Sequence, residues 1–417
     1  MILPARVPAA RRWLAAAGLL LSTAGLVGCS EDASVPPPSA TATSAAPDAG
    51  EAQQVVADLE MALRAQDAAG AAKTGVAAAG PQLRAMVANV GKLGLTDLGL
   101  RYVDTAALDP AAADRFGPSA WEAVVEVSYR LPRWDAQATR VETPFVLVPD
   151  GDGQRIAAVG APGGRTPLWM AGPVQVAAGE RTLVISRSGL TPYTTLARRA
   201  VRDVGLVLHG WRGTLVLEVP ASETELDQVL DAPQEQYANI AAVTAAVDGT
   251  LARGAPVHVF VNPRVFSRIG PRGSQVVLSH ETTHVATGAT FAVDLPTWLL
   301  EGFADYVALA HADIPVRTAA SQILARIRKQ GAPDHLPTAH ELDPTATGLG
   351  ATYEEAWLAT RFLAAQHGEA KLVAFYRAVD RGTPVTTAFA SVLGTTEAAF
   401  TKRWRADLLR LAGGEPG

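Results

Sequence analysis

Two histidines and a glutamate in one short stretch have the types and spacing needed to bind a metal ion and move a proton. The stretch is His280-Glu281-Thr282-Thr283-His284, an H-E-x-x-H pattern. Residues four apart lie one turn apart on a helix, so both imidazoles can project from one face and bind a single zinc ion. Glu281 lies beside them, where a carboxylate can accept a proton from zinc-bound water and return it to a leaving amine. The pattern therefore predicts a zinc site with an adjacent general base.

The surrounding residues predict the helix that positions this pattern. Ser274 can cap a helix that begins at Gln275, and Gly288 is placed to end it. The two histidines fall on the apolar stripe of Val277 and Leu278. Unpaired imidazoles are costly on such a stripe, which favours metal ligation over two solvated surface histidines.

A catalytic zinc site needs a third protein ligand, and the position of that ligand separates classes of enzyme. Metzincins continue with a glycine and a histidine at the positions that Thr287 and Thr290 hold here, so that class is excluded. Two carboxylates follow His284, Asp294 and then Glu301. Asp294 would be the ligand in an aspzincin, but the glycine-threonine context of that class is not matched. Glu301 is the favoured third ligand.

Glu301 lies in a second predicted helix, which Pro296 would open at its first turn. Asp305 is one turn beyond Glu301 on that helix. Glu301 can therefore bind zinc while Asp305 accepts a hydrogen bond from the far nitrogen of a ligand histidine, for which His280 is the favoured partner.

Together, H-E-x-x-H and the later W-L-x-E-G-x-A-x-Y at residues 298–306 resemble the gluzincin zinc metallopeptidases, particularly their peptidase-MA-like branch. The resemblance implies that His280, His284 and Glu301 bind Zn²⁺ and that Glu281 is the general base. It also implies a peptide or protein substrate. Related enzymes place a tyrosine on a following helix to stabilise the developing oxyanion, and Tyr353 is the candidate here, with a packing role as the alternative.

One motif of the family is missing. The G-A-M-E-N-type exopeptidase motif does not precede His280, so an exopeptidase that reads a free amine is less supported. The predicted strand at 257–261 stands where gluzincins often have the edge strand that pairs with an extended substrate. Cleavage preference and endo- or exopeptidase action stay open.

The first 28 residues resemble a bacterial lipoprotein signal peptide. Arg6, Arg11 and Arg12 precede an apolar run at 13–27, which is shorter than a membrane-spanning helix needs. The run ends in L-V-G-C, which resembles a lipobox, and Cys29 is the only cysteine of the chain. We expect cleavage before Cys29 and lipidation of its thiol, which would anchor the chain on the extracytoplasmic face of a bacterial cell membrane. Secretion without an anchor is the alternative.

The remaining sequence predicts an α+β protein. Residues 29–50 are poor in large apolar side chains and predict a tether. Residues 51–165 predict two helices and then antiparallel strands, with apolar residues at alternate positions of 121–129 and a hairpin turn at 150–153. The order of these elements resembles the nuclear transport factor 2-like fold. A strand-rich connector is expected at 166–191.

Residues 192–417 are expected to form the catalytic domain, mostly helical with a small sheet. A β-rich run at 214–219 and the strand at 257–261 supply that sheet. Ser222 and Glu225 form a capping box that opens a helix after the first of these strands.

Composition limits the function further. Among 417 residues, 48% are hydrophobic and 18% charged, a globular composition, and the formal net charge is -5. No block of Lys and Arg is present, so we expect no nucleic-acid partner.

The rival interpretation is a non-catalytic envelope lipoprotein that uses the gluzincin scaffold for binding or assembly. The presence of Glu281 disfavours it, since binding alone needs no general base. Zinc-dependent hydrolysis of a non-peptide substrate stays open.

Overall fold

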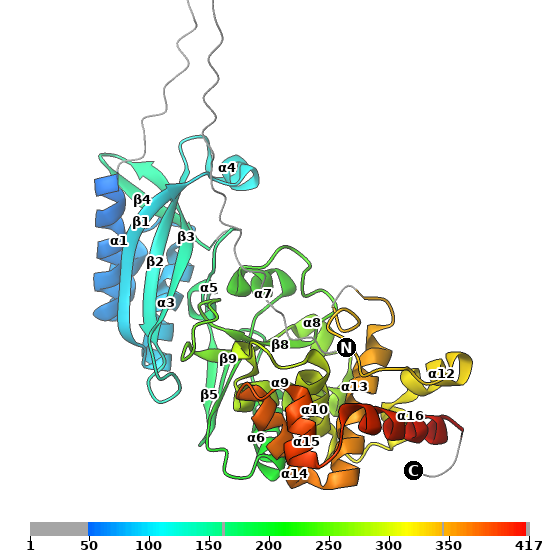
Figure 1. The fold of residues 1–417 in the computed structure, drawn as a ribbon. Coiled ribbons are helices and arrows are strands. Elements are labelled where there is room, and N and C mark those ends of the chain that lie inside the picture. Colours follow the sequence, from blue (N-terminus) through cyan, green and yellow to red (C-terminus); the bar gives the residue numbers. More distant parts are fainter. Residues whose placement is uncertain (1–48, 161–162, 344–345, 414–417) are drawn as a thin grey trace, which may run out of the picture.

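The computed structural model describes residues 49–160, 163–343 and 346–413. These residues form an α+β protein with an N-terminal antiparallel sheet followed by a mostly helical part built on a second sheet (Figure 1), which confirms the predicted fold class. The predicted signal peptide at 1–28 and lipidated Cys29 lie outside the described residues. Of the predicted tether, 29–50, the described part belongs to the first helix, α1 (Ala49–Arg64).

The N-terminal unit contains four helices and four antiparallel strands. The strands pair in the order β1-β2-β3-β4. The elements are α1, α2 (Ala68–Lys73), α3 (Gly80–Leu93), β1 (Thr96–Ala106), α4 (Pro110–Phe116), β2 (Trp121–Arg130), β3 (Thr139–Asp150) and β4 (Gly153–Val159). The sequence did not predict β1 or α4. The resemblance to the nuclear transport factor 2-like fold stays a prediction.

Alternate side chains of the strands are buried, so one face of this sheet packs against the helices of the N-terminal unit. In β2, Val125 and Val127 are fully buried, whereas Glu126 between them is only partly buried. Leu59 of α1 and Leu83 of α3 belong to the same apolar core. The predicted hairpin turn between β3 and β4 is confirmed.

The second sheet has five strands, in the order β5-β6-β7-β9-β8. They are β5 (Gln175–Ala178), β6 (Thr182–Ser186), β7 (Leu215–Val219), β8 (Ala242–Ala246) and β9 (Val257–Val261). β6, β7 and β9 run parallel, and β5 and β8 pair antiparallel at the two edges. The expectation that 257–261 is an edge strand is wrong, because β8 pairs with its outer side. β5 and β6, within the stretch expected to be a connector, are strands of this sheet.

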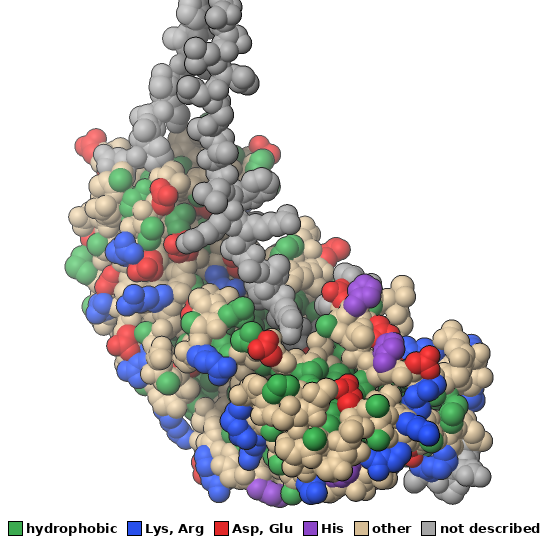
Figure 2. All heavy atoms as spheres, in the orientation of Figure 1, with side chains coloured by type: hydrophobic (Ala, Val, Ile, Leu, Met, Phe, Trp, Pro, Cys, Tyr) green, Lys and Arg blue, Asp and Glu red, His purple; other side chains and the backbone are tan. Residues whose placement is uncertain are grey.

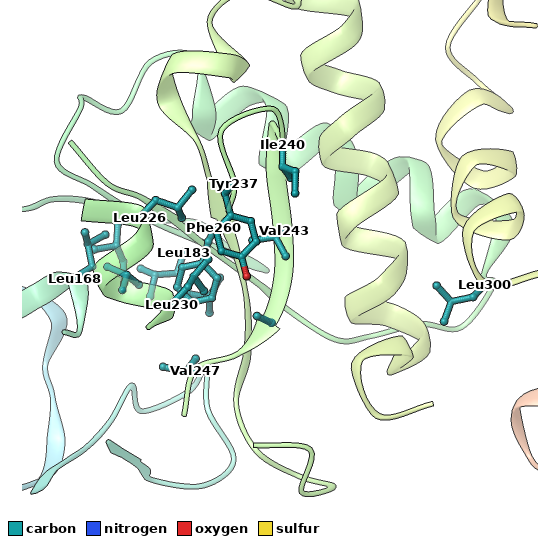
Figure 3. Close-up of a cluster of buried hydrophobic side chains, with 14 of the residues drawn as sticks. Leu168, Leu183, Leu226, Leu230, Tyr237, Ile240, Val243, Val247, Phe260 and Leu300 are labelled. Carbon is teal, nitrogen blue, oxygen red and sulfur yellow. The ribbon is translucent and has the colours of Figure 1, made fainter. Parts of the chain in front are cut away.

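Helices cover both faces of the second sheet. Alternate apolar side chains of β7, β8 and β9 pack under α6 (Tyr193–Val207) and α9 (Gly270–Thr287). The opposite face packs against α7 (Glu223–Leu230), whose Ser222 cap accepts a hydrogen bond from the Glu225 N–H as predicted. Figure 3 shows Leu183, Leu226, Leu230, Tyr237, Val243 and Phe260 gathered in that apolar layer.

The remaining elements of the described residues are helices. The short helices are α5 (Leu168–Ala171), α8 (Pro263–Phe266), η1 (Ala289–Phe291) and α11 (Val316–Ala319). The longer ones are α10 (Thr297–Leu309), α12 (Ser321–Gln330), α13 (Leu349–His367), α14 (Glu369–Asp380), α15 (Val385–Leu393) and α16 (Glu397–Gly413). Within the described ranges, none is long and apolar enough to cross a membrane. Basic and acidic side chains are both spread over the face shown in Figure 2.

A buried cluster of charged groups joins the two sheets. His258 of β9 contacts Glu218 of β7 through Nδ1 at 2.6 Å and Asp135, in the loop after β2, through Nε2 at 3.0 Å. All three side chains are buried. Burial alone would lower the pKa of His258, but the two carboxylates outweigh it and raise that pKa to about 10. A charged imidazolium therefore ties the N-terminal unit to the second sheet.

Candidate metal centre

Helix α9 presents the H-E-x-x-H residues from inside the protein. It begins at Gly270, earlier than predicted, and Ser274 is not its cap, since the Ser274 hydroxyl lies within the helix and donates to the carbonyl of Phe266 at 3.3 Å. The helix ends at Gly288, which has a φ of 69°. Glycine adopts this left-handed conformation without strain, so the predicted end is confirmed.

Helix α10 brings the carboxylates to α9. Pro296 is its N-cap, directly before the first helical residue. A side chain at Gly302 would approach the carbonyl oxygen of Ala356 to 2.3 Å, so only glycine allows α10 to lie this close to α13. The Thr360 hydroxyl donates to the Gly302 carbonyl at 2.7 Å and holds the contact. The helix after Glu301 is therefore fixed against its neighbour.

Three potential ligands converge between α9 and α10. The Nε2 atoms of His280 and His284 are 2.9 Å apart. Glu301 Oε2 is 3.4 Å from the first of these nitrogens and 3.6 Å from the second. In the described part of the chain, these residues form the group whose ligand atoms lie close enough to hold one metal ion. The competing ligand Asp294 is exposed in the preceding loop and does not belong to this group.

The burial of carboxylate oxygens without hydrogen-bond partners also indicates that these donor atoms fit a zinc ion. Oε1 of Glu301 and Oε1 of Glu281 are buried without a hydrogen-bond partner among the described residues, whereas Oε2 of Glu301 faces the two imidazole nitrogens. Buried carboxylate oxygens are costly unless they are paired or bind a metal. Two imidazole nitrogens and one carboxylate are also the ligand set of open, catalytic zinc sites. The residues present therefore fit zinc.

Electrostatics favour a cation here. Burial raises the pKa of Glu281 and outweighs the opposing effect of the two histidines. For Glu301, burial acts in the same direction, but the adjacent histidines prevail and lower its pKa. Burial would lower the pKa of His280, yet Asp305, with Glu301 and Glu281, raises it to about 10. Three acids around two imidazoles thus attract positive charge, whether a proton or a metal ion.

The other predicted residues also lie near this centre. Asp305 Oδ1 is 2.7 Å from Nδ1 of His280. Tyr353 lies on α13, which packs against α10, and is buried. Burial, together with the negative charges of Glu301, Asp305 and Glu281, raises the pKa of Tyr353 well above its usual value, so its hydroxyl stays protonated. The catalytic role of Tyr353 stays a prediction.

Sequence reasoning missed one residue of the centre. Thr244 of β8 has its hydroxyl 2.7 Å from Glu281 Oε2. The strand reads A-V-T-A-A, and alanine is depleted in strands, so little in its composition indicates a strand. No sequence signal links this threonine to a helix that begins 26 residues later.

Comparisons with known proteins give a limited result. No protein-family model matches the chain, and no curated protein is significantly similar to it. Among solved structures, a mutant two-domain M1 zinc metallopeptidase bound to L-arginine aligns at 16% identity, with a TM-score of 0.35 and coverage of 62% of this chain and 58% of that one.

Two further structures are similar at the same level. A mutant M1 zinc metallopeptidase from Deinococcus radiodurans aligns at 17% identity, with a TM-score of 0.34 and coverage of 62% of this chain and 58% of that one. Its complex with a Tyr-Ser-Ala substrate also aligns at 17% identity, with a TM-score of 0.36 and coverage of 72% and 62%. The alignments thus span less than two thirds of those chains. Similarity this low does not assign the chain to their family.

Proposed function

We propose that this chain is a zinc-dependent metallopeptidase of the gluzincin type, which hydrolyses peptide bonds outside the cytoplasmic membrane and is anchored by a lipid on Cys29. The proposal rests on the convergence of His280, His284 and Glu301 and on the buried Oε1 atoms of Glu281 and Glu301, which have no hydrogen-bond partner among the described residues. Zinc, when bound, supplies Lewis-acid chemistry by polarising a carbonyl and lowering the pKa of water to about 7.

Side chains of the protein would carry out the proton transfer, orient a ligand histidine and stabilise the oxyanion. Glu281 accepts the proton of the attacking water and then delivers it to the departing amine. Burial raises the pKa of this carboxyl group, which makes it a stronger base for the first of these two transfers. Asp305 holds the ring of His280 in place, and the protonated hydroxyl of Tyr353 can donate to a developing oxyanion.

The test combines metal analysis with peptide cleavage. The protein, purified without chelator and then saturated with zinc, is expected to hold one zinc per chain and to cleave members of a peptide library detected by mass spectrometry. Glu281→Gln should keep the zinc and lose at least about 100-fold in turnover, as general-base catalysis contributes on this order. Stoichiometric zinc without cleavage would instead support the non-catalytic lipoprotein. Cleavage by Glu281→Gln at the parental rate would contradict the mechanism.

A further inference from the structure

The side chain of Thr244 contacts the carboxylate of Glu281 directly. Thr244 Oγ1 lies 2.7 Å from Oε2 and 3.0 Å from the backbone carbonyl oxygen of the same glutamate. Thr244 is 4% exposed and Glu281 fully buried. Since a threonine hydroxyl has one hydrogen to donate, a charged carboxylate is the preferred acceptor.

The strand register explains why a polar group stands at this place. Thr244 is opposite Val259 in the pairing of β8 with β9. Its neighbours Val243 and Ala245 belong to the apolar layer on the far side of the sheet, while Ala242 shares the apolar cluster under α9. Thr244 therefore places a hydroxyl on the α9 side of the sheet, where its hydrogen-bonding partner is Glu281.

The contact leaves the two oxygens of Glu281 in different situations. Oε2 accepts from Thr244, whereas Oε1 has no partner among the described residues. The last torsion of a glutamate side chain is broad, so an isolated carboxylate can present either oxygen in many orientations. A hydrogen bond to one oxygen removes this freedom and directs the other.

We infer that Thr244 is a positioning residue for the general base: it holds Oε2 of Glu281 and thereby directs Oε1 to the proton that must be moved. This inference rests on the proposed function. Two threonines of α9 show the contrasting structural role. Thr282 and Thr283 donate only to helix carbonyls, those of Leu278 at 2.6 Å and Ser279 at 2.8 Å.

Steady-state kinetics on four variants tests the inference. Thr244→Val keeps the shape of the side chain and removes the donor, so kcat should fall by about 10- to 100-fold, as expected for a misplaced catalytic group. KM and zinc content should stay as in the parent. Thr244→Ser keeps the hydroxyl donor and should retain most of the parental kcat. Thr244→Ala also removes the donor and should show the same loss of kcat, which gives a second test if the valine variant folds poorly. Thr143→Val is the matched control, a buried strand threonine of the N-terminal unit whose hydroxyl donates to the backbone carbonyl of Arg165, and it should stay near the parental kcat.

Crystal structures of the zinc-loaded parent and Thr244→Val give a readout that does not depend on activity. In the parent, one carboxylate oxygen of Glu281 should stay within hydrogen-bond distance of the threonine hydroxyl. In the valine variant, that carboxylate should turn or lose order. Should the parent cleave no peptide, the proposed function fails, while this pair of structures still decides the positioning role. An unchanged Glu281 carboxylate, or a parental kcat in Thr244→Val, would overturn the inference.

Discussion

Asp305 Oδ1 lies 2.7 Å from Nδ1 of His280, across the contact between α9 and α10. A carboxylate in this position accepts a hydrogen bond from Nδ1–H, so in the neutral ring the lone pair is left on Nε2. That is the nitrogen which faces His284 and Glu301. One side chain from α10 thus favours one neutral tautomer of a histidine on α9.

Removal of the Asp305 carboxylate should weaken zinc binding. We expect about 10- to 100-fold lower zinc affinity for Asp305→Ala, because a ligand histidine loses its orienting partner. Asp305→Asn should lose less, since the amide oxygen still accepts a hydrogen bond. Titration against a competing chelator measures both. Parental affinity in Asp305→Ala would show that the contact with His280 does not support the ligand.

A matched pair of substitutions tests whether Glu301 or Asp294 is the third zinc ligand. Glu301→Gln should abolish stoichiometric zinc binding, because a neutral amide replaces the carboxylate next to the two histidines. Asp294→Asn should bind zinc as the parent does, because Asp294 is exposed and lies outside the ligand group. The zinc content of each variant after dialysis measures the effect. Loss of zinc in Asp294→Asn together with parental zinc in Glu301→Gln would make Asp294 the ligand.

Tyr353→Phe distinguishes an oxyanion donor from a packing residue. If the hydroxyl stabilises the transition state, kcat should fall by about 100-fold or more, as for other oxyanion donors, while the zinc content stays unchanged. Because phenylalanine keeps the apolar ring, the packing of α13 should survive. Initial-rate kinetics with a cleaved peptide measures the effect. A parental kcat would leave Tyr353 with a packing role.

The ion cluster of His258 should make stability depend on pH. The pKa of His258 is raised to about 10 in the folded protein, against an unperturbed value of about 6.5. A raised folded-state pKa contributes stability that is complete below the unfolded pKa and is lost as pH rises through the folded one. We therefore expect the contribution of His258 to decline between about pH 6.5 and 10.

Thermal unfolding of two histidine variants across that range measures this contribution. His258→Leu leaves Asp135 and Glu218 buried without their partner, which should cost about 3–5 kcal/mol near neutral pH. The difference from the parent should shrink toward pH 10. His311→Leu, at an exposed position, is the control and should follow the parent. A pH-independent difference would mean that His258 stabilises the sheets by packing alone.

The lipid anchor is a separate prediction. Cys29→Ser removes the only thiol of the chain, so it should prevent incorporation of labelled fatty acid and release the protein from the membrane fraction. Ser30→Ala, at the next residue, should leave both unchanged. Fractionation of bacterial cells that express the full chain measures the outcome. Labelling that persists in the serine variant would exclude Cys29 as the acylated residue.

Sequence patterns were sufficient for several features that depend on local geometry. The spacing of His280 and His284 predicts one shared helix face, and Gly288 predicts the end of that helix. The alternation of apolar residues in β2 and the hairpin turn after β3 were also predicted from the sequence. These features depend on helical period, strand period and turn conformation, which a short segment determines by itself.

Tertiary structure alone decided the relationships between distant segments. It placed β8 outside β9 and so made 257–261 an interior strand, and it brought Thr244 to Glu281 and Asp135 to His258. Strand order and side-chain contacts across the core arise from the packing of whole elements, and no local period encodes them. The sequence by itself therefore predicts which residues could hold a metal and move a proton, and the fold decides which neighbours contact them.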